Sequence, residues 1–179
     1  MNRSVLCLLL VPLLGAVSVA SRAAENMPAV TELRIGNASM SDQSMMRELF
    51  DRWERVWHEG QFDLVPSRVG EHYIRHDEGG DRTITREAYA AEIAKIRQER
   101  PDIRVVVYDH AFEGNRAWFR FAFRWTDPTT GESRSRAGMQ SYRTEGGKLV
   151  ETWLSMQPLG SAWSDTAAQE HWTSPPPIK

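Results

Sequence analysis

With 179 residues, 41% of them hydrophobic and 26% charged, the chain has the length of one ordinary globular domain, which excludes a multidomain assembly. The net charge of −2 and the mixing of acidic and basic residues leave no basic stripe, so a nucleic-acid partner is not expected. The only cysteine, Cys7, lies in the first apolar run, which excludes disulfides and cysteine-based zinc sites from the rest of the chain.

Residues 1–23 have the signature of a secretory signal peptide. Arg3 gives a positive start, an apolar run follows over 5–19, and small residues predict cleavage after Ala20 or Ala23. An uncleaved anchor is the alternative, although the run is shorter than the roughly 20 residues that span a bilayer. Cleavage would give a secreted or periplasmic chain with no membrane attachment.

The helices are expected in the first half of the domain. Residues 24–40 have little periodicity and predict a flexible lead-in. Apolar residues at spacings of three and four predict an amphipathic helix over 41–58 and a third helix over 85–99. Between them, a short helical piece interrupted by proline is predicted over 61–69, and an extended segment over 71–77 runs into a glycine turn.

From residue 103 the apolar period changes from 3.6 to 2, which predicts strands. In the second strand phenylalanines alternate with Arg and Ala, so its apolar face must be covered. Three helices followed by a meander predict an α+β domain over 41–160, with the helices on the concave side of a curved antiparallel sheet. A tail, 161–179, is predicted to cross the domain or a neighbour. The four predicted strands are 103–108, 117–126, 134–144 and 148–157.

The segment 142–153, which reads Tyr-Arg-Thr-Glu-Gly-Gly-Lys-Leu-Val-Glu-Thr-Trp, follows a His-Asp pair at 76–77. Together they resemble the nuclear transport factor 2-like superfamily, in particular its SnoaL-like polyketide and ester cyclase branch. The resemblance covers about residues 45–157 and implies a conical half-barrel with a mostly apolar cavity. It further implies a homodimer formed through the sheets.

For function, the resemblance implies binding of a small apolar carbonyl compound. Isomerisation, cyclisation or dehydration by acid–base chemistry, without a cofactor, is the expected activity. The alternative is a non-catalytic carrier of a hydrophobic ligand, or a dimeric interaction module. The cyclase branch often has an Asp shortly after the tryptophan of this motif, and that Asp is missing here, which argues against cyclisation specifically.

Three residues are the expected catalytic groups. The resemblance puts His76 where the steroid-isomerase branch keeps its base, and an imidazole titrates near neutral pH. Asp77 can orient His76 or be the base itself, although strand alternation puts neighbours on opposite faces and a turn-forming role is the alternative. Gln140 falls at the position of an acid donor, and its amide can donate to a substrate oxygen.

The expected pocket wall is mostly aromatic. Trp53 falls where the steroid-isomerase branch has a helical tyrosine donor, and plain core packing is the alternative for both Trp53 and Trp57. Glu151 shares a strand face with Trp153, and the pattern leaves open which face of this strand looks into the cone. The expected substrate-binding residues are Trp53, Trp57, Phe119, Phe121, Phe123, Tyr142 and Glu151.

No metal site is predicted. His72 and His76 lie four residues apart, which suits a metal ion on a helix but not on an extended segment. A set of arginines on the strands can form an anion-binding site on one face of the sheet. The alternative is that these arginines lie on the outer face of the sheet and pair with Asp and Glu side chains. This set consists of Arg120, Arg124, Arg134 and Arg136.

Overall fold

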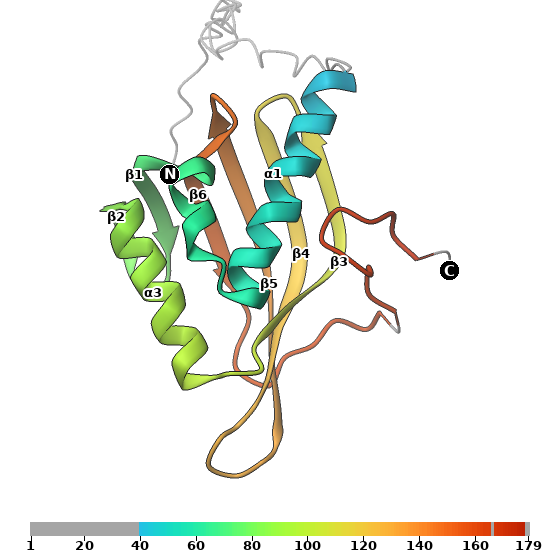
Figure 1. Cartoon of the computed structure of the whole chain (residues 1–179). Helices are drawn as coiled ribbons and strands as arrows, with labels where there is room; N and C mark the ends of the chain where they lie inside the picture. The colour runs from blue at the N-terminus through green and yellow to red at the C-terminus, as the bar shows by residue number, and fades with distance from the viewer. Residues whose placement is uncertain (1–39, 166, 178–179) are drawn as a thin grey trace, which may run out of the picture. The chain divides into compact units, whose positions relative to one another are not determined.

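The computed structural model describes residues 40–165 and 167–177 (Figure 1). The predicted signal peptide, 1–23, and all but the last residue of the predicted lead-in lie outside the described residues. Within the described part, no helix is both long enough and apolar enough to span a membrane.

Helix α1 (Met40–Glu59) forms where the sequence predicts it, because its apolar residues recur on one face. That face is buried, and Gly60, at a φ of 72°, turns the chain away after the helix. A 3-10 turn, η1 (Phe62–Leu64), leads into the four-residue helix α2 (Val65–Arg68). The most deeply buried residues of α1 are Leu49, Phe50, Trp53 and Val56.

Helix α3 (Arg86–Glu99) begins at a capping residue. The hydroxyl of Thr85 accepts a hydrogen bond from the backbone N–H of Ala88 at 3.1 Å, which satisfies one of the free donors of the first turn. Tyr89 and Ile93 form the buried face of the helix. This face packs on the sheet and so sets the distance between the helix and the strands below it.

The six strands form one sheet with the order β2-β1-β6-β5-β4-β3. The pairs are antiparallel except β1 with β6, which is parallel. Strands β3 to β6 form the predicted meander, and the predicted α+β class is confirmed. The strands are β1 (Val69–Asp77), β2 (Gly80–Thr85), β3 (Arg104–Glu113), β4 (Arg116–Thr126), β5 (Ser133–Glu145) and β6 (Lys148–Met156).

Strand β2 corrects the sequence prediction, which had only a turn and then a helix in this stretch. The turn is shorter, with Glu78 and Gly79 between the strands, and Gly80 has a φ of 88°. The strand pairs with β1 from Asp77 to His72. Four of its six residues are exposed, so β2 has no apolar alternation that a sequence pattern would register.

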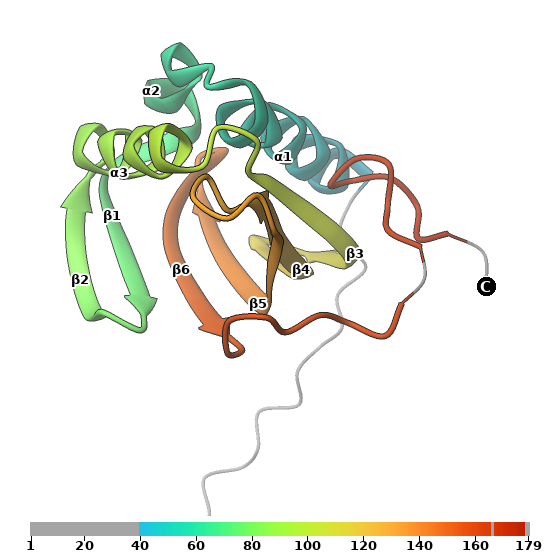
Figure 2. The ribbon, with the colours of Figure 1, turned by 90° about the horizontal axis from the view of Figure 1, so that it is seen from below.

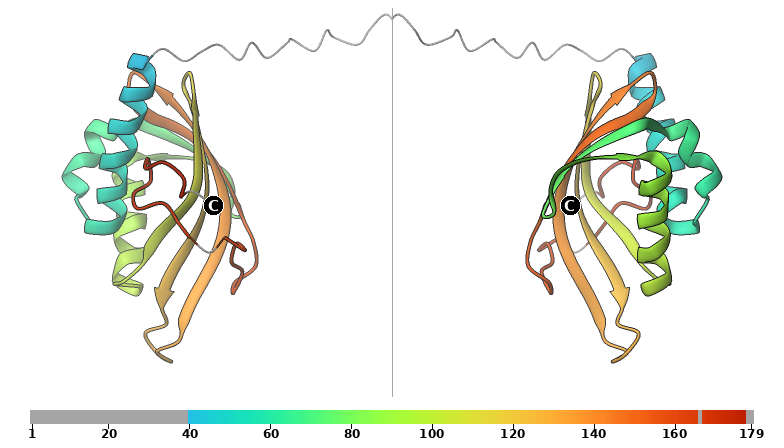
Figure 3. Two further views of the ribbon diagram at one scale, coloured as in Figure 1. Left: turned by 90° about the vertical axis from the view of Figure 1, so that its right-hand side faces the viewer. Right: turned by 90° about the vertical axis from the view of Figure 1, so that its left-hand side faces the viewer.

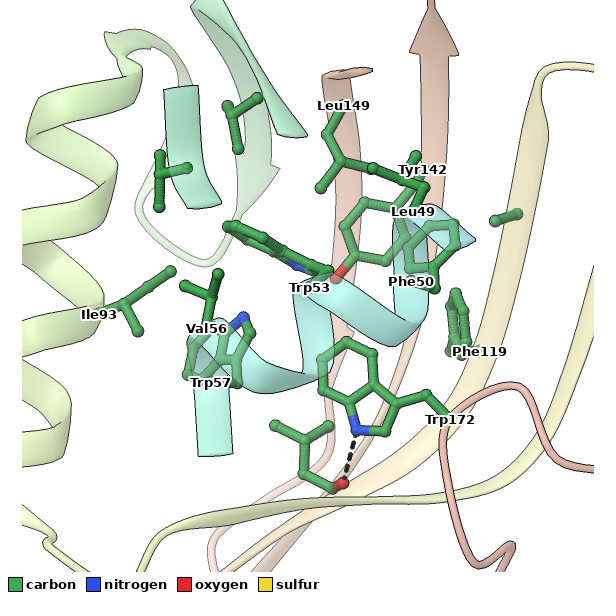
Figure 4. Packing of buried hydrophobic residues seen from close by; sticks show 14 of the residues in the cluster. Leu49, Phe50, Trp53, Val56, Trp57, Ile93, Phe119, Tyr142, Leu149 and Trp172 are labelled. Atoms are coloured by element: carbon green, nitrogen blue, oxygen red, sulfur yellow. Dashed lines mark hydrogen bonds between the residues drawn. The ribbon is translucent and has the colours of Figure 1, made fainter. Parts of the chain in front are cut away.

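The helices and the sheet form two layers around one core. Figure 2 shows α1 and α3 on the same, concave side of the curved sheet, and both views of Figure 3 show the helices on one side and the strands on the other. In Figure 4, Trp53 and Phe50 of α1 lie against Phe119 and Tyr142 of the sheet. The aromatic face of β4 is therefore covered by α1, as the sequence predicts.

The C-terminal tail adds a layer of its own. Trp163 donates its indole N–H to the carbonyl of Phe121 at 2.7 Å, and the N–H of Gln169 bonds to the carbonyl of Val107 at 2.8 Å. Trp172 then enters the core beside α1, where it is 3% exposed (Figure 4). Of the two predicted alternatives, the described tail thus crosses its own domain.

Candidate active site

A cavity of about 590 Å³ lies between α3 and the concave side of the sheet. Its size is within the range of small-molecule sites. The wall is mainly apolar, with a group of charged side chains on part of it. The apolar lining residues are Ile96, Ile103, Phe123, Trp125, Leu154, Met156 and Leu159, and the charged ones are Asp77, Glu78, Arg82, Arg100 and Arg136.

Strand alternation along β1 determines which of its side chains meet the cavity. Tyr73 is fully buried, and the guanidinium of Arg75 lies 4.6 Å from the ring centroid of Tyr89 on α3. Residues 73, 75 and 77 therefore face the helices, and Asp77 lines the cavity. His76, one residue earlier, faces the other way.

Asp77 is held as an ionised carboxylate. Its oxygens pair with Arg75 at 3.0 Å and Arg82 at 2.7 Å, and one accepts the N–H of Gly79 at 2.9 Å. Burial by itself raises the pKa of Asp77, but the Gly79 and Arg82 hydrogen bonds and the charge of Arg75 outweigh it, so the pKa is lowered. The cavity wall therefore carries a negative charge throughout the neutral range.

His76 lies on the convex face of the sheet, away from the cavity. Its ring stacks on Trp153 with 5.0 Å between centroids, and its two nitrogens contact Glu151 at 3.0 Å and Asp81 at 2.8 Å. Hydrogen bonds to Glu151 and Asp81 raise the pKa of His76. The expectation that His76 lines the cavity is therefore corrected. Tyr73 is buried on the face of β1 that packs against the helices, so His76 lies on the opposite face.

Glu151 shares this convex face. One of its oxygens accepts the Nε–H of Arg143 at 2.7 Å, and the other contacts His76. Arg116 lies over the neighbouring Trp153, 4.9 Å from the ring centroid. The expectation that Glu151 binds the ligand is corrected accordingly, since on β6 the residues facing the cavity are Leu154 and Met156.

Gln140 faces the helices but is not among the cavity-lining residues. Its amide donates to the hydroxyl of Thr152 at 2.9 Å, and Thr152 is fully buried. Nearby in the core, the indole nitrogen of Trp53 and the hydroxyl of Tyr73 are fully buried, close to the hydroxyls of Tyr142 and Thr152 respectively. Figure 4 shows the Trp53 nitrogen beside the hydroxyl of Tyr142.

Most of the predicted aromatic wall is core rather than cavity surface. Phe123 lines the cavity, whereas the others pack in the hydrophobic cluster. The alternative of plain core packing holds for Trp53, which is fully buried, and for Trp57, which is 7% exposed. The expected substrate-binding residues that belong to the cluster and not to the cavity wall are Trp53, Trp57, Phe119, Phe121 and Tyr142.

The arginine set predicted from the strands divides between faces. Arg136 pairs in register with Phe123 and lines the cavity, whereas Arg120 contacts Trp163 and Asp165 of the tail. Arg82 and Arg100 were not predicted, because β2 gave no strand pattern and Arg100 follows a helix end. Among the described residues there is no cluster of three or more His, Cys, Asp or Glu suited to a metal ion.

Helices packed on the concave side of a curved, unclosed sheet, with a cavity at the open end, define the class of cone-shaped proteins with the nuclear transport factor 2-like fold. Residues 47–162 match the family model of the SnoaL-like polyketide cyclases, so the chain belongs to this family. The resemblance inferred from the 142–153 motif is thereby confirmed. No curated protein matches the sequence significantly.

Solved structures show the same fold. A crystal structure of a polyketide cyclase from Acidithiobacillus ferrooxidans, whose assignment is provisional, is 22% identical, with a TM-score of 0.59, over 66% of this chain and 92% of that one. TsrD from Streptomyces laurentii is 19% identical, with a TM-score of 0.57, over 65% of this chain and 90% of that one. A SnoaL-like polyketide cyclase from Agrobacterium tumefaciens is 16% identical, with a TM-score of 0.54, over 63% and 91%.

Proposed function

We propose that this protein binds a small, largely apolar carbonyl compound in the cavity and catalyses its isomerisation, cyclisation or dehydration without a cofactor. The observation that carries this proposal is the ionised carboxylate of Asp77 in the wall of a mostly apolar cavity. Membership of the SnoaL-like polyketide cyclase family supports the reaction class. Asp77 takes the role of proton acceptor that was first expected of His76.

The environment of Asp77 restricts the chemistry. A carboxylate with a lowered pKa is a weak base, so it removes a proton efficiently only from carbon acidified by adjacent carbonyl groups. A β-keto ester or a 1,3-dicarbonyl compound has such carbon. The guanidinium of Arg82, 2.7 Å from Asp77, can stabilise the negative charge that develops on the enolate oxygen.

A non-catalytic carrier is the second candidate, and it also rests on Asp77. Both carboxylate oxygens are engaged by Arg75, Arg82 or the Gly79 N–H. In a carrier, this ion-pair group only shapes the cavity wall, and the ligand leaves unchanged. The two candidates share the binding step and differ in whether Asp77 is needed for turnover.

Binding in the cavity is tested by thermal denaturation of the purified protein with enones, lactones, β-keto esters and fatty acids. A ligand at 100 times its Kd is expected to stabilise the fold by about 2.7 kcal/mol. Leu154→Trp fills the cavity and should abolish the shift, whereas Thr130→Trp, in the exposed loop between β4 and β5, should retain it. An equal shift in the folded Leu154→Trp variant would contradict binding at this place.

We also propose that the protein is a homodimer. A shallow apolar groove of about 310 Å³ lies on the convex face, where Trp118 is 37% and Met139 54% exposed. Exposed apolar side chains gathered on one face are typical of protein interfaces. His76 and Trp153 line the same groove, so their contacts would lie in the interface rather than in the active site.

We further propose that the protein is exported and that its first 20 or 23 residues are removed. The chain recovered from the periplasm of a Gram-negative host should show this loss by mass spectrometry.

The homodimer is tested by light scattering at micromolar concentration, which should give twice the chain mass for the parent protein and the mass of one chain for Met139→Asp. A full-length chain would contradict cleavage, and a monomeric parent protein would contradict the dimer.

A further inference from the structure

Of the three arginines that line the cavity, two are paired with a carboxylate and one is not. Arg82 pairs with Asp77 at 2.7 Å, and Arg136 pairs with Glu78 at 2.5 Å. Arg100 has no carboxylate within ion-pair distance among the described residues, although it lines the same cavity. A positive charge on a mainly apolar wall attracts an anionic group strongly, because the nearby apolar surface keeps water away.

Arg100 is also held in position for a ligand. It is the C-cap residue directly after α3, and its backbone N–H bonds to the carbonyl of Ile96 at 3.0 Å. Its guanidinium lies 4.9 Å from the ring centroid of Trp125, another lining residue. A guanidinium stacked on an aromatic ring keeps its N–H donors at its edge, where they can bind a carboxylate with two hydrogen bonds.

The surroundings of Arg100 specify the rest of the ligand. Ile96 and Ile103 precede and follow it along the chain, and both line the cavity. A cation at a helix C-terminus is favourable by itself, but that role needs neither the stacking on Trp125 nor the apolar neighbours. An acid with an apolar body would pair its head group with Arg100 and bury its chain against these residues.

We propose that the ligands of this cavity are apolar carboxylic acids, bound through their carboxylate by Arg100. This inference rests on the proposed function, since it specifies the class of compound that enters the same cavity. For the reaction, the head group at Arg100 would fix the position of a keto group in the body of the acid relative to Asp77. An acid that carries a 1,3-dicarbonyl group along its apolar body, apart from the carboxylate, fits this arrangement.

Calorimetric titration of the full chain with octanoate and octan-1-ol tests the head group separately from the apolar body. The protein should bind octanoate at least about tenfold more tightly, as charge-assisted hydrogen bonds would give. Arg100→Gln should remove this preference and leave the affinity for octan-1-ol unchanged. Arg100→Lys, which keeps the charge without the paired donors, should retain part of the preference.

Arg104→Gln is the matched control, because Arg104 donates to the carbonyl of His58 and does not line the cavity. This variant should keep the full preference for octanoate. Equal binding of the acid and the alcohol by the parent protein would overturn the inference and leave the proposed function standing. A preference retained in Arg100→Gln would also overturn it, whereas a folded protein that binds neither probe would contradict the proposed function itself.

Discussion

Asp77→Asn is expected to lower turnover by about 10²- to 10⁴-fold, the usual contribution of a general base, while the Kd of the ligand changes only a few-fold. The amide keeps the shape of the side chain and loses the ability to accept a proton. The fold should survive the change, because Arg75 and Arg82 both retain Glu92 as a partner, at 2.8 and 3.3 Å.

The measurement is deuterium exchange at the enolisable carbon of a ligand found by thermal denaturation, followed by NMR. His76→Gln is the matched control: it changes the neighbouring residue, which lies on the other face of the same strand, and should leave the exchange rate within about threefold of the parent. Exchange that persists in Asp77→Asn would favour the carrier. Exchange lost only in His76→Gln would identify His76, the residue first expected, as the base.

The pH dependence of activity is a second test of Asp77 as the base. Because the pKa of Asp77 is lowered, the ionised, active form is present throughout the neutral range. Activity should therefore stay level through that range and fall only at acid pH, below the ordinary carboxyl pKa of about 4. The ion-pair contribution of Asp77 to stability has the same sign: it is present above the unfolded pKa and is lost as pH falls through the lower, folded pKa.

Trp172→Ala is expected to destabilise the protein by about 3–5 kcal/mol, the usual cost of removing a buried tryptophan. The indole is 3% exposed and donates to the carbonyl of Val105 at 3.1 Å. It also packs against Phe119, with 6.0 Å between ring centroids. Its loss leaves a cavity beside α1 and an unbonded carbonyl, and removes one of the contacts that hold the tail on the domain.

Urea unfolding followed by circular dichroism measures this effect. Met45→Ala is the control, because Met45 is 56% exposed on α1, away from the proposed dimer interface, and its loss should cost less than about 1 kcal/mol. A loss below about 1 kcal/mol for Trp172→Ala would mean that the tail does not stabilise the domain in solution.

Periodicity predicted the layers of the fold but not the direction of each strand face. The alternation of Phe119, Phe121 and Phe123 is strong enough to identify the buried side of β4. Strand β1 has polar residues on both faces, so nothing local indicates that Asp77 rather than His76 turns inward. Its orientation is decided by Tyr73 packing on Tyr89 of α3, a contact between separate elements.

The charged part of the cavity was harder still to predict. Arg82 lies on a strand without apolar alternation, and Arg100 lies at the end of a helix whose position over the sheet no local pattern reveals. The role of Trp172 depends on a contact with β3, far earlier in the chain. In contrast, the order of residues in the 142–153 motif was enough to predict the family, although Glu151 and Trp153 lie on the convex face.

The parallel pairing of β1 with β6 has a consequence for how the site assembles. These strands are the only parallel neighbours in the described sheet, and their register joins His76 to Trp153 across most of the domain sequence. Contacts between such distant residues form slowly, because a long loop must close first. We expect the meander and α1 to gain structure early and β1 to dock late. Asp77 is the last residue of β1, so the carboxylate would reach the cavity only when folding is nearly complete.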